Sequence, residues 1–516
     1  MPDPEPSSSS APDLIRALGR VDATMIVMGS MIGSGIFITS AESARLVGAP
    51  GWLLVAWAVA GLLTIAGALC SAEVASMMPR AGGQYVFLRE AYGPSIGFMF
   101  GWATFLVVQT GTIAAVAVAF AKFLGVFAPG VSDTHYLIPP VHLGRLGYAL
   151  SLSTQQCVAV ALIAGLTLLN TRGLRAGKLI QNTFTFAKTA ALIGLIAVGL
   201  FFGANRDSAA WTAAWWDSAA NGWSLATSQE GLSATGGLGF ALVLGKAMIG
   251  PLFSQTAWNS VTFTGGEVRE PGKTLPFALV IGCGTVILLY MLANLAYLVS
   301  LPFDQIQHAE KDRVGTAVMR AVLGTGGVYA MAAAIMVSTF GCVNGLVLSG
   351  ARVFYAMARD GLFFRKVGTT NAHHVPAVAL LAQGAWAIFL VLPVTVSVDA
   401  ATGRPGYGNT YSDLLQFLAP VDLSFYMLMV GTCLVFRLKR PDAERPYRTF
   451  AYPLPLVFYL GVAGLLVADF IYLEPRTAGI GYAIALIGIP VYWLRNRFMK
   501  DRPIGDPGLS ASADDR

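Results

Sequence analysis

A short stretch of small residues interrupts the first long apolar run of the chain. It reads Ser30-Met31-Ile32-Gly33-Ser34-Gly35-Ile36-Phe37. Two glycines around a serine favour local unwinding of a helix, because glycine adds conformational freedom and offers no side chain for packing. An unwound backbone inside a membrane is tolerated where it lines a protein cavity. The half-helix that follows would present its amide groups and the positive end of its dipole, a geometry that binds a carboxylate. For this motif alone, a small-residue helix-packing face is an equally good explanation.

A second interruption lies in the sixth apolar run. It reads Gly250-Pro251-Leu252-Phe253-Ser254-Gln255-Thr256-Ala257-Trp258-Asn259. Pro251 lacks the backbone donor and clashes with the preceding turn, and Ser254, Gln255 and Thr256 can satisfy the freed backbone. We therefore expect the helix to be interrupted within this stretch. Two interrupted helices five spans apart indicate an inverted five-plus-five repeat with a site at the midplane. Carbonyl groups at the end of the outer half-helix suit an ammonium. A carboxylate site and an ammonium site together describe an α-amino acid.

Charged residues within the apolar runs are further candidates. A lysine at the middle of a span costs about 2.5–3.5 kcal/mol on insertion scales, so such a residue is paired or functional. Lys188 lies about eight residues from the cytoplasmic loop, which at 1.5 Å per residue is further than a side chain comfortably snorkels. We therefore favour a functional role for Lys188 over a snorkelling one.

Lys246 and Asp422 form a hypothetical pair. Lys246 precedes Phe253 by seven residues, which is about 10 Å along a helix. Asp422 lies in the tenth run. Opposite charges in a membrane usually pair or mark the substrate route. We hypothesise that the two side chains approach each other near an external vestibule and support an outer gate. The alternative is two independent charges wetted by that vestibule.

Two further acids receive structural interpretations. Glu73 lies near the cytoplasmic end of the second run, where pairing with a loop arginine is favoured over a proton site. Asp469 is expected to lie close enough to the outer interface to be solvated. Neither acid is a candidate site residue.

Membrane-spanning helices are the elements that position these residues. Of the 516 residues, 55% are hydrophobic and 12% are charged, against roughly 25% charged in soluble domains. The apolar residues fall in runs of about 20, the length that crosses a bilayer. The runs predict an all-α membrane protein with 12 transmembrane helices, of which helices 1 and 6 are discontinuous, at Val21–Val47, Gly51–Met78, Ser95–Phe127, Thr154–Asn170, Ile180–Phe202, Gly237–Gly265, Leu275–Ser300, Val328–Tyr355, Val375–Val396, Ser412–Phe436, Pro455–Leu473 and Ala478–Leu494.

Basic residues predict the orientation of these helices. If both termini are cytoplasmic, 23 lysines and arginines lie on the cytoplasmic side and 8 on the other. Cytoplasmic loops carry such an excess, so we expect both termini in the cytoplasm. The predicted divisions are a disordered N-terminus at 1–20, one transporter domain at 21–494 and a cytoplasmic tail at 495–516. Within the domain we expect repeats at about 21–202 and 237–436, followed by two helices at about 455–494.

Several function classes are disfavoured. The net charge of +6 follows the topology of the loops and does not indicate a nucleic-acid partner. All five cysteines lie in apolar runs and all five histidines lie outside them, so no disulfide framework, metal site or cofactor is expected. A membrane enzyme is disfavoured because the spans contain no metalloprotease motif, paired catalytic carboxylates or nucleophile elbow. Short termini disfavour a sensor.

An ordered set of motifs resembles the amino acid–polyamine–organocation superfamily, which has the LeuT-type fold, and within it the L-type amino-acid transporter family. The resemblance covers nearly everything from Val21 to Leu494. Besides the first interruption, its motifs are Asn294-Leu295-Ala296-Tyr297, Phe340-Gly341-Cys342-Val343-Asn344-Gly345 with Arg352, Glu444-Arg445-Pro446, Gly479-Ile480-Gly481-Tyr482 and Ile489-Pro490-Val491-Tyr492.

The resemblance implies roles for residues at both interruptions. Ser34 and Gly35, beside Gly33, would bind the substrate carboxylate. The carbonyls of Met31, Phe253, Ser254 and Thr256 would hold the ammonium, and Phe253 would also cap the pocket. Asn259 would brace the broken sixth helix or touch the substrate. Lys188 would occupy the place of a sodium ion in sodium-coupled relatives, tying span five to the carbonyls of span one and to span eight.

Departures from the family pattern bear on partners and substrate. The loop 128–153 has no cysteine, whereas animal L-type members use one there to link a glycoprotein heavy chain. We expect no such partner, as in the prokaryotic members, and a location in the cytoplasmic (inner) membrane. Gln255, Thr256 and Ala257 replace residues of more glycine or aromatic character. Asp422 and Leu423 stand where the family often has asparagine and tryptophan.

The sequence therefore predicts a secondary transporter of amino acids that works by alternating access. Sodium-independent exchange or proton-linked uptake is favoured, and a sodium-coupled symporter or a polyamine or cationic amino-acid transporter of the same fold is the alternative. No acidic residue clearly lines the pocket around Ser34 and Phe253, so we expect neutral substrates.

Overall fold

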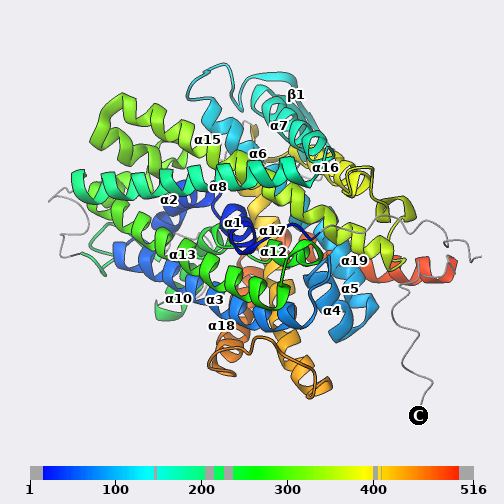
Figure 1. Cartoon of the computed structure of the whole chain (residues 1–516). Helices are drawn as coiled ribbons and strands as arrows, with labels where there is room; N and C mark the ends of the chain where they lie inside the picture. The colour runs from blue at the N-terminus through cyan, green and yellow to red at the C-terminus, as the bar shows by residue number, and fades with distance from the viewer. Residues whose placement is uncertain are drawn as a thin grey trace, which may run out of the picture.

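Helices packed side by side make up most of the molecule (Figure 1). The computed structural model describes residues 16–143, 148–203, 214–225, 236–398, 405–407 and 410–498. Its α-helices are α1 (Arg20–Met31), α2 (Gly35–Val47), α3 (Pro50–Met77), α4 (Gln84–Tyr92), α5 (Pro94–Ala103), α6 (Gln109–Leu124), α7 (Thr154–Asn170), α8 (Leu174–Ala197), α10 (Gly236–Ala247), α11 (Ile249–Ser254), α12 (Ser260–Phe263), α13 (Pro271–Ser300), α14 (Phe303–Gln307), α15 (Val314–Arg359), α16 (Ala377–Val391), α17 (Thr410–Lys439), α18 (Leu454–Leu473) and α19 (Pro475–Phe498).

Ten helical segments in the described part of the chain are long and apolar enough to cross a membrane. They coincide with ten of the apolar runs. The other two runs form α7 and α16, apolar helices of 17 and 15 residues. The π-helical turns Thr104–Val108 and Val198–Phe202 join α5 to α6 and extend α8.

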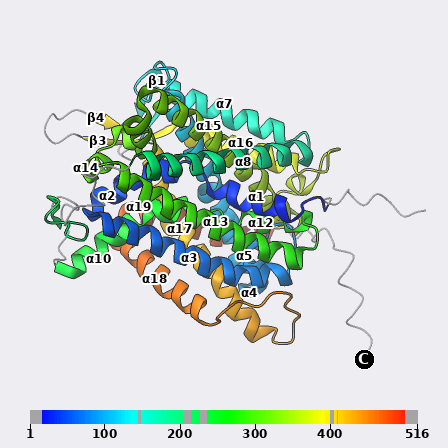
Figure 2. The same ribbon diagram turned by 60° about the vertical axis from the view of Figure 1, so that its left-hand side comes forward.

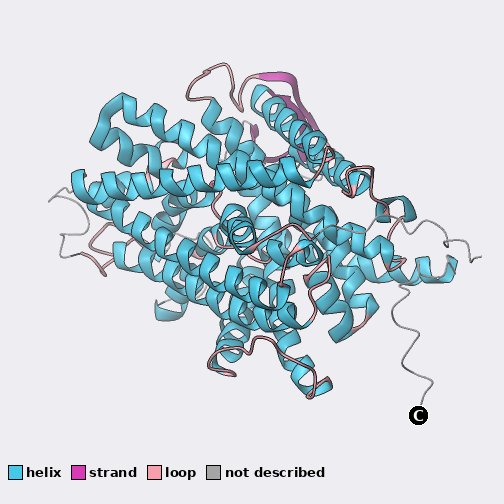
Figure 3. Ribbon diagram, in the orientation of Figure 1, coloured by secondary structure: helices cyan, strands magenta, loops and turns pink. Residues whose placement is uncertain are grey.

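A four-stranded antiparallel sheet departs from the all-α expectation. Its strands are β1 (Tyr136–His142), β2 (Tyr148–Ser153), β3 (Pro393–Val398) and β4 (Pro405–Tyr407), in the order β1-β2-β3-β4. Figure 3 shows the strands gathered at one edge of the helical molecule. The predicted ninth span ran to Val396, but α16 ends at Val391. Pro393 cannot continue a helix, and the β-branched residues that follow favour a strand.

The two ends of the bundle carry different elements. Strands β3 and β4 lie with α14 at one end, which we call the sheet end, whereas α4 and α12 lie towards the other (Figure 2). Of the predicted terminal segments, residues 1–15 and 499–516 lie outside the described residues. Helix α19 continues to Phe498, beyond the predicted end of the domain at 494.

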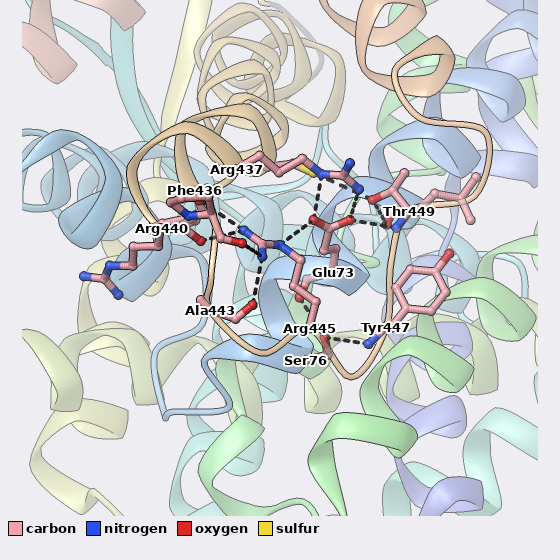
Figure 4. A network of polar contacts seen from close by, with 12 residues as sticks. Glu73, Ser76, Phe436, Arg437, Arg440, Ala443, Arg445, Tyr447 and Thr449 are labelled. Atoms are coloured by element: carbon pink, nitrogen blue, oxygen red, sulfur yellow. Dashed lines mark hydrogen bonds and ion pairs between the residues drawn. The ribbon is translucent and has the colours of Figure 1, made fainter.

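Glu73 in α3 organises the end of the bundle opposite the sheet. Its carboxylate accepts hydrogen bonds from Arg437 Nε at 2.9 Å and Nη2 at 2.6 Å, and from the Thr449 backbone amide at 2.7 Å. Arg445 Nε lies 3.4 Å away. Arg445 also donates to the carbonyl of Phe436 near the end of α17 and to three carbonyls of the loop that follows, so it shapes the turn after α17 (Figure 4). The predicted pairing of Glu73 with a loop arginine is confirmed.

Candidate substrate site

The first broken helix has the predicted form. Helix α1 ends at Met31, Ile32 leaves the helical region with φ −72° and ψ 90°, and α2 begins at Gly35. A Cβ atom at Gly35 would lie 2.1 Å from Ser254 Oγ and 3.0 Å from Ser254 Cα. Glycine is therefore required here because the backbone of the second broken helix lies directly against it.

The second broken helix is interrupted within the predicted stretch. Pro251 lies inside α11, which ends at Ser254, and α12 begins at Ser260. Ala257 between them has a left-handed φ of 64°, which a non-glycine residue adopts rarely. Pro251 provides no amide for the Ala247 carbonyl four residues earlier, and the hydroxyl of Ser43 donates to that carbonyl instead, at 2.8 Å. A side chain from α2 thus compensates for the missing helical hydrogen bond.

Several backbone carbonyls assigned to the ammonium already accept hydrogen bonds. The Met31 carbonyl accepts from the Tyr290 hydroxyl at 2.9 Å, and the Phe253 carbonyl accepts from the Thr256 hydroxyl at 2.7 Å. The Ser254 hydroxyl donates to the Gly250 carbonyl at 2.7 Å. The Thr256 backbone amide also donates to the Phe253 carbonyl, at 3.1 Å. A carbonyl oxygen has two lone pairs, so the Met31 carbonyl keeps capacity for a substrate ammonium, whereas that of Phe253 already accepts two hydrogen bonds.

Lys188 makes the contacts that the family resemblance implies. Its side chain is fully buried. The ammonium donates to the carbonyls of Gly29 and Ile32 in the first span, the latter at 2.8 Å, and lies 3.5 Å from the carbonyl of Ser338 in α15. Ser338 Oγ donates to the carbonyls of Ile32 and Gly33, each at 3.2 Å. Spans five and eight therefore hold the unwound turn of span one together.

Asn259 connects the second break to α4 and α17. Its amide nitrogen donates to the side chain of Gln84 in α4, and its amide oxygen accepts from the Tyr426 hydroxyl at 2.9 Å. The same hydroxyl accepts from the backbone amide of Ala257 at 3.1 Å. These contacts are those of a residue that braces the broken helix. Tyr426 was missed from the sequence, although it follows Asp422 by one helical turn.

The hypothetical pair of Lys246 and Asp422 is wrong. Lys246 Nζ instead contacts Glu474 Oε1 at 2.8 Å, at the junction of α18 and α19. Asp422 lines an internal cavity together with Phe253, Gln255, Thr256, Tyr426 and Tyr459, which we call the Asp422 cavity. An acid therefore lines a cavity beside Phe253, although Ser34 is not part of that cavity's lining.

Asp469 is buried rather than solvated. Its side chain in α18 is 6% exposed, and neither carboxylate oxygen has a hydrogen-bond partner among the described residues. A Cβ atom at Gly245 would lie 2.0 Å from Asp469 Oδ2, so the carboxylate packs against the backbone of α10 next to Lys246. This expectation from the sequence is also wrong.

The ion pair of Lys246 and Glu474 predicts a specific double-mutant result. We expect Lys246→Met and Glu474→Gln each to lower the melting temperature, by an amount equivalent to about 1 kcal/mol for a partly exposed pair. The double variant should lose less stability than the sum of the two single variants, because the second substitution removes an interaction that the first has already broken. Lys246→Met with Asp422→Asn should be additive. Melting of the purified variants in detergent measures both cycles, and equal coupling in the two would contradict the pairing.

Two broken helices in contact at the centre of a bundle of membrane-length helices are the arrangement of a secondary transporter. The chain belongs to the amino acid permease family, which matches residues 18–493. It is 27% identical to the mouse large neutral amino acids transporter small subunit 2 over 93% of this chain and 81% of that protein. It is 26% identical to the human Asc-type amino acid transporter 1 over 96% of this chain and 85% of that protein. It is 27% identical to the mouse b(0,+)-type amino acid transporter 1 over 90% of this chain and 83% of that protein. The resemblance to the L-type family is confirmed.

Proposed function

We propose that this protein is a sodium-independent secondary transporter, and not an enzyme, that moves amino acids across the cytoplasmic membrane by alternating access. The observation that carries the proposal is the contact between the start of α2 at Gly35 and the end of α11 at Ser254. The start of a half-helix presents amide groups and the end of one presents carbonyl groups, and these groups complement the carboxylate and ammonium of an amino acid. Exchange and proton-linked uptake are both compatible with this site.

The proposed architecture has twelve spans, with α7 and α16 as the fourth and ninth. Both are shorter than the ten long spans, and their positions differ by five, as do those of the two broken spans. This correspondence supports an inverted repeat of five plus five helices. The distribution of basic residues supports cytoplasmic termini. The absence of cysteine from the loop 128–153 supports a transporter without a disulfide-linked heavy chain, as in prokaryotic members.

Lys188 carries the proposal of sodium independence. Its ammonium donates to the carbonyls of Gly29 and Ile32 and approaches that of Ser338. Carbonyl oxygens from two spans are also what a sodium ion would coordinate, so the fixed ammonium replaces the ion. A cation supplied by the protein does not depend on the external sodium concentration.

Flux in proteoliposomes tests the function. We expect purified protein to take up labelled amino acid equally in sodium and choline buffers. If the protein is an exchanger, uptake should be faster when the proteoliposomes contain unlabelled amino acid. Lys188→Ala should reduce uptake more than about tenfold, because removing the ammonium leaves several buried carbonyls without a donor. Lys366→Ala, which removes an exposed lysine, is the matched control. A sodium requirement in the unmodified protein would contradict the role of Lys188, and an absence of flux would contradict transport.

A further inference from the structure

The Asp422 cavity contains a carboxylate that the proposed function does not yet use. Asp422 lies in α17 and faces residues that surround the second break. Among the described residues, none forms a hydrogen bond or an ion pair with its carboxylate. The lysines of neighbouring spans are engaged elsewhere, Lys188 on backbone carbonyls and Lys246 on Glu474. A charge within a membrane span is costly unless it is paired, and it marks the substrate path.

Three side-chain donors in the wall of the Asp422 cavity are engaged with other groups. The hydroxyls of Thr112 and Thr256 donate to the carbonyls of Val108 and Phe253, both at 2.7 Å. The Tyr426 hydroxyl donates to Asn259 Oδ1 at 2.9 Å. None of these three groups supplies a proton to Asp422, although all three lie in the cavity wall.

Gln255 adds a second acceptor to the same wall. Its amide nitrogen donates to the Trp57 carbonyl at 3.3 Å, while its side-chain oxygen is buried and has no partner among the described residues. The remaining donors of the wall are the Thr64 and Tyr459 hydroxyls and the Trp258 indole N–H. The Asp422 carboxylate and the Gln255 side-chain oxygen are thus two acceptors in one wall without a donor among the described residues, and a ligand with several donors complements them. An ammonium is such a group.

Aromatic rings add to this preference for a cation. Trp258 and Tyr426 are stacked with ring centroids 5.2 Å apart, and both line the cavity. The faces of aromatic rings attract cations. Leu252 and Leu423 complete an apolar wall that suits the methylene groups of a long side chain. The cavity holds about 40 Å³ in this conformation, close to the volume of one water molecule, so it must widen when the broken helices separate.

We propose that Asp422 binds the cationic end of the substrate side chain, so that the transported amino acids are basic ones such as lysine and ornithine. This inference rests on the proposed function, because the α-carboxylate and α-ammonium of the substrate occupy the two breaks. Its side chain then passes Phe253 and Thr256 into the Asp422 cavity. A neutral side chain would leave the carboxylate buried without a counter-charge.

Lysine and norleucine provide a matched pair of probes, because norleucine has a carbon chain of similar length without the terminal ammonium. We expect the unmodified protein in proteoliposomes to prefer lysine. In Asp422→Asn, the ratio of lysine to norleucine uptake should fall by at least about thirtyfold, the effect of truncating one partner of a buried charge pair. Norleucine uptake should rise, since no carboxylate is left unpaired. Asp442→Asn, which removes an exposed carboxylate, should keep the original ratio.

The outcomes separate the substrate class from transport itself. Uptake of either amino acid supports the proposed function, whereas uptake of neither contradicts it together with the role of Asp422. Uptake of norleucine in preference to lysine by the unmodified protein overturns the present inference alone. It is also overturned if Asp422→Asn keeps the original ratio but loses a dependence of uptake on pH, because Asp422 would then carry a proton.

Discussion

We expect replacement of Gly35 with valine to abolish amino-acid uptake, because the two broken helices are in contact at this residue. Even a single Cβ atom would lie 2.1 Å from Ser254 Oγ, 2.8 Å from Ser254 Cβ and 3.0 Å from Ser254 Cα. Overpacking of this kind costs about 1–3 kcal/mol and displaces backbone. The half-helices would be forced apart where their amide and carbonyl groups must converge. Uptake into proteoliposomes, normalised to folded protein measured by gel filtration, should fall below detection.

Two further variants separate this effect from general damage. Gly194→Val places the same side chain in α8 at a position with no heavy atom within 4 Å, and it should transport normally. Gly35→Ala should be severely impaired, and Ser254→Gly should restore part of its activity by removing the nearest atoms. Near-normal uptake by well-folded Gly35→Val protein would show that the substrate does not bind between the broken helices.

Loss of the Arg352 side chain should have the largest effect on stability. Arg352 in α15 is 0% exposed and pairs at 3.1 Å with Glu267, which is 1% exposed and follows α12. Its guanidinium also donates to the Leu348 carbonyl. Arg352→Met leaves a carboxylate buried without a partner, a change that costs about 3–5 kcal/mol. We expect the yield of monodisperse protein and the melting temperature to fall sharply.

Removing both charges tests whether the unpaired carboxylate is the cause. Arg352→Met combined with Glu267→Leu should recover most of the folded protein, because an apolar pair of similar volume often replaces a buried ion pair at little cost. Arg320→Met is the matched control, since Arg320 and Glu310 form an exposed pair that contributes little. A double variant as unstable as Arg352→Met alone would show that the arginine stabilises the protein through other contacts.

Features that depend on local chemistry were predictable from the sequence. The apolar runs predicted the helices because twenty consecutive apolar residues suit a bilayer wherever they occur. The first break follows from Gly33 and Gly35, whose flexibility is a property of the residues themselves. Lys188 was identifiable because a lysine at that depth needs acceptors, and the unwound backbone of span one supplies them.

Features that depend on contacts between distant segments were decided by the tertiary structure. Pro251 stays helical because Ser43, from another helix, donates to the carbonyl that proline leaves without a donor. Strand β3 pairs with β2, a partner more than two hundred residues away that hydropathy does not reveal.

The partners of the buried charges also depended on contacts between distant segments. Their place within apolar runs identified Lys246 and Asp422 as costly charges. It did not identify their partners, because pairing depends on how helices from different parts of the chain are rotated against one another. Packing of α10 against α18 brings Lys246 to Glu474. Packing of α17 against the second break directs Asp422 into the cavity beside Phe253. The sequence by itself determined that these charges require partners or a ligand, and the rotation of the packed helices decided which.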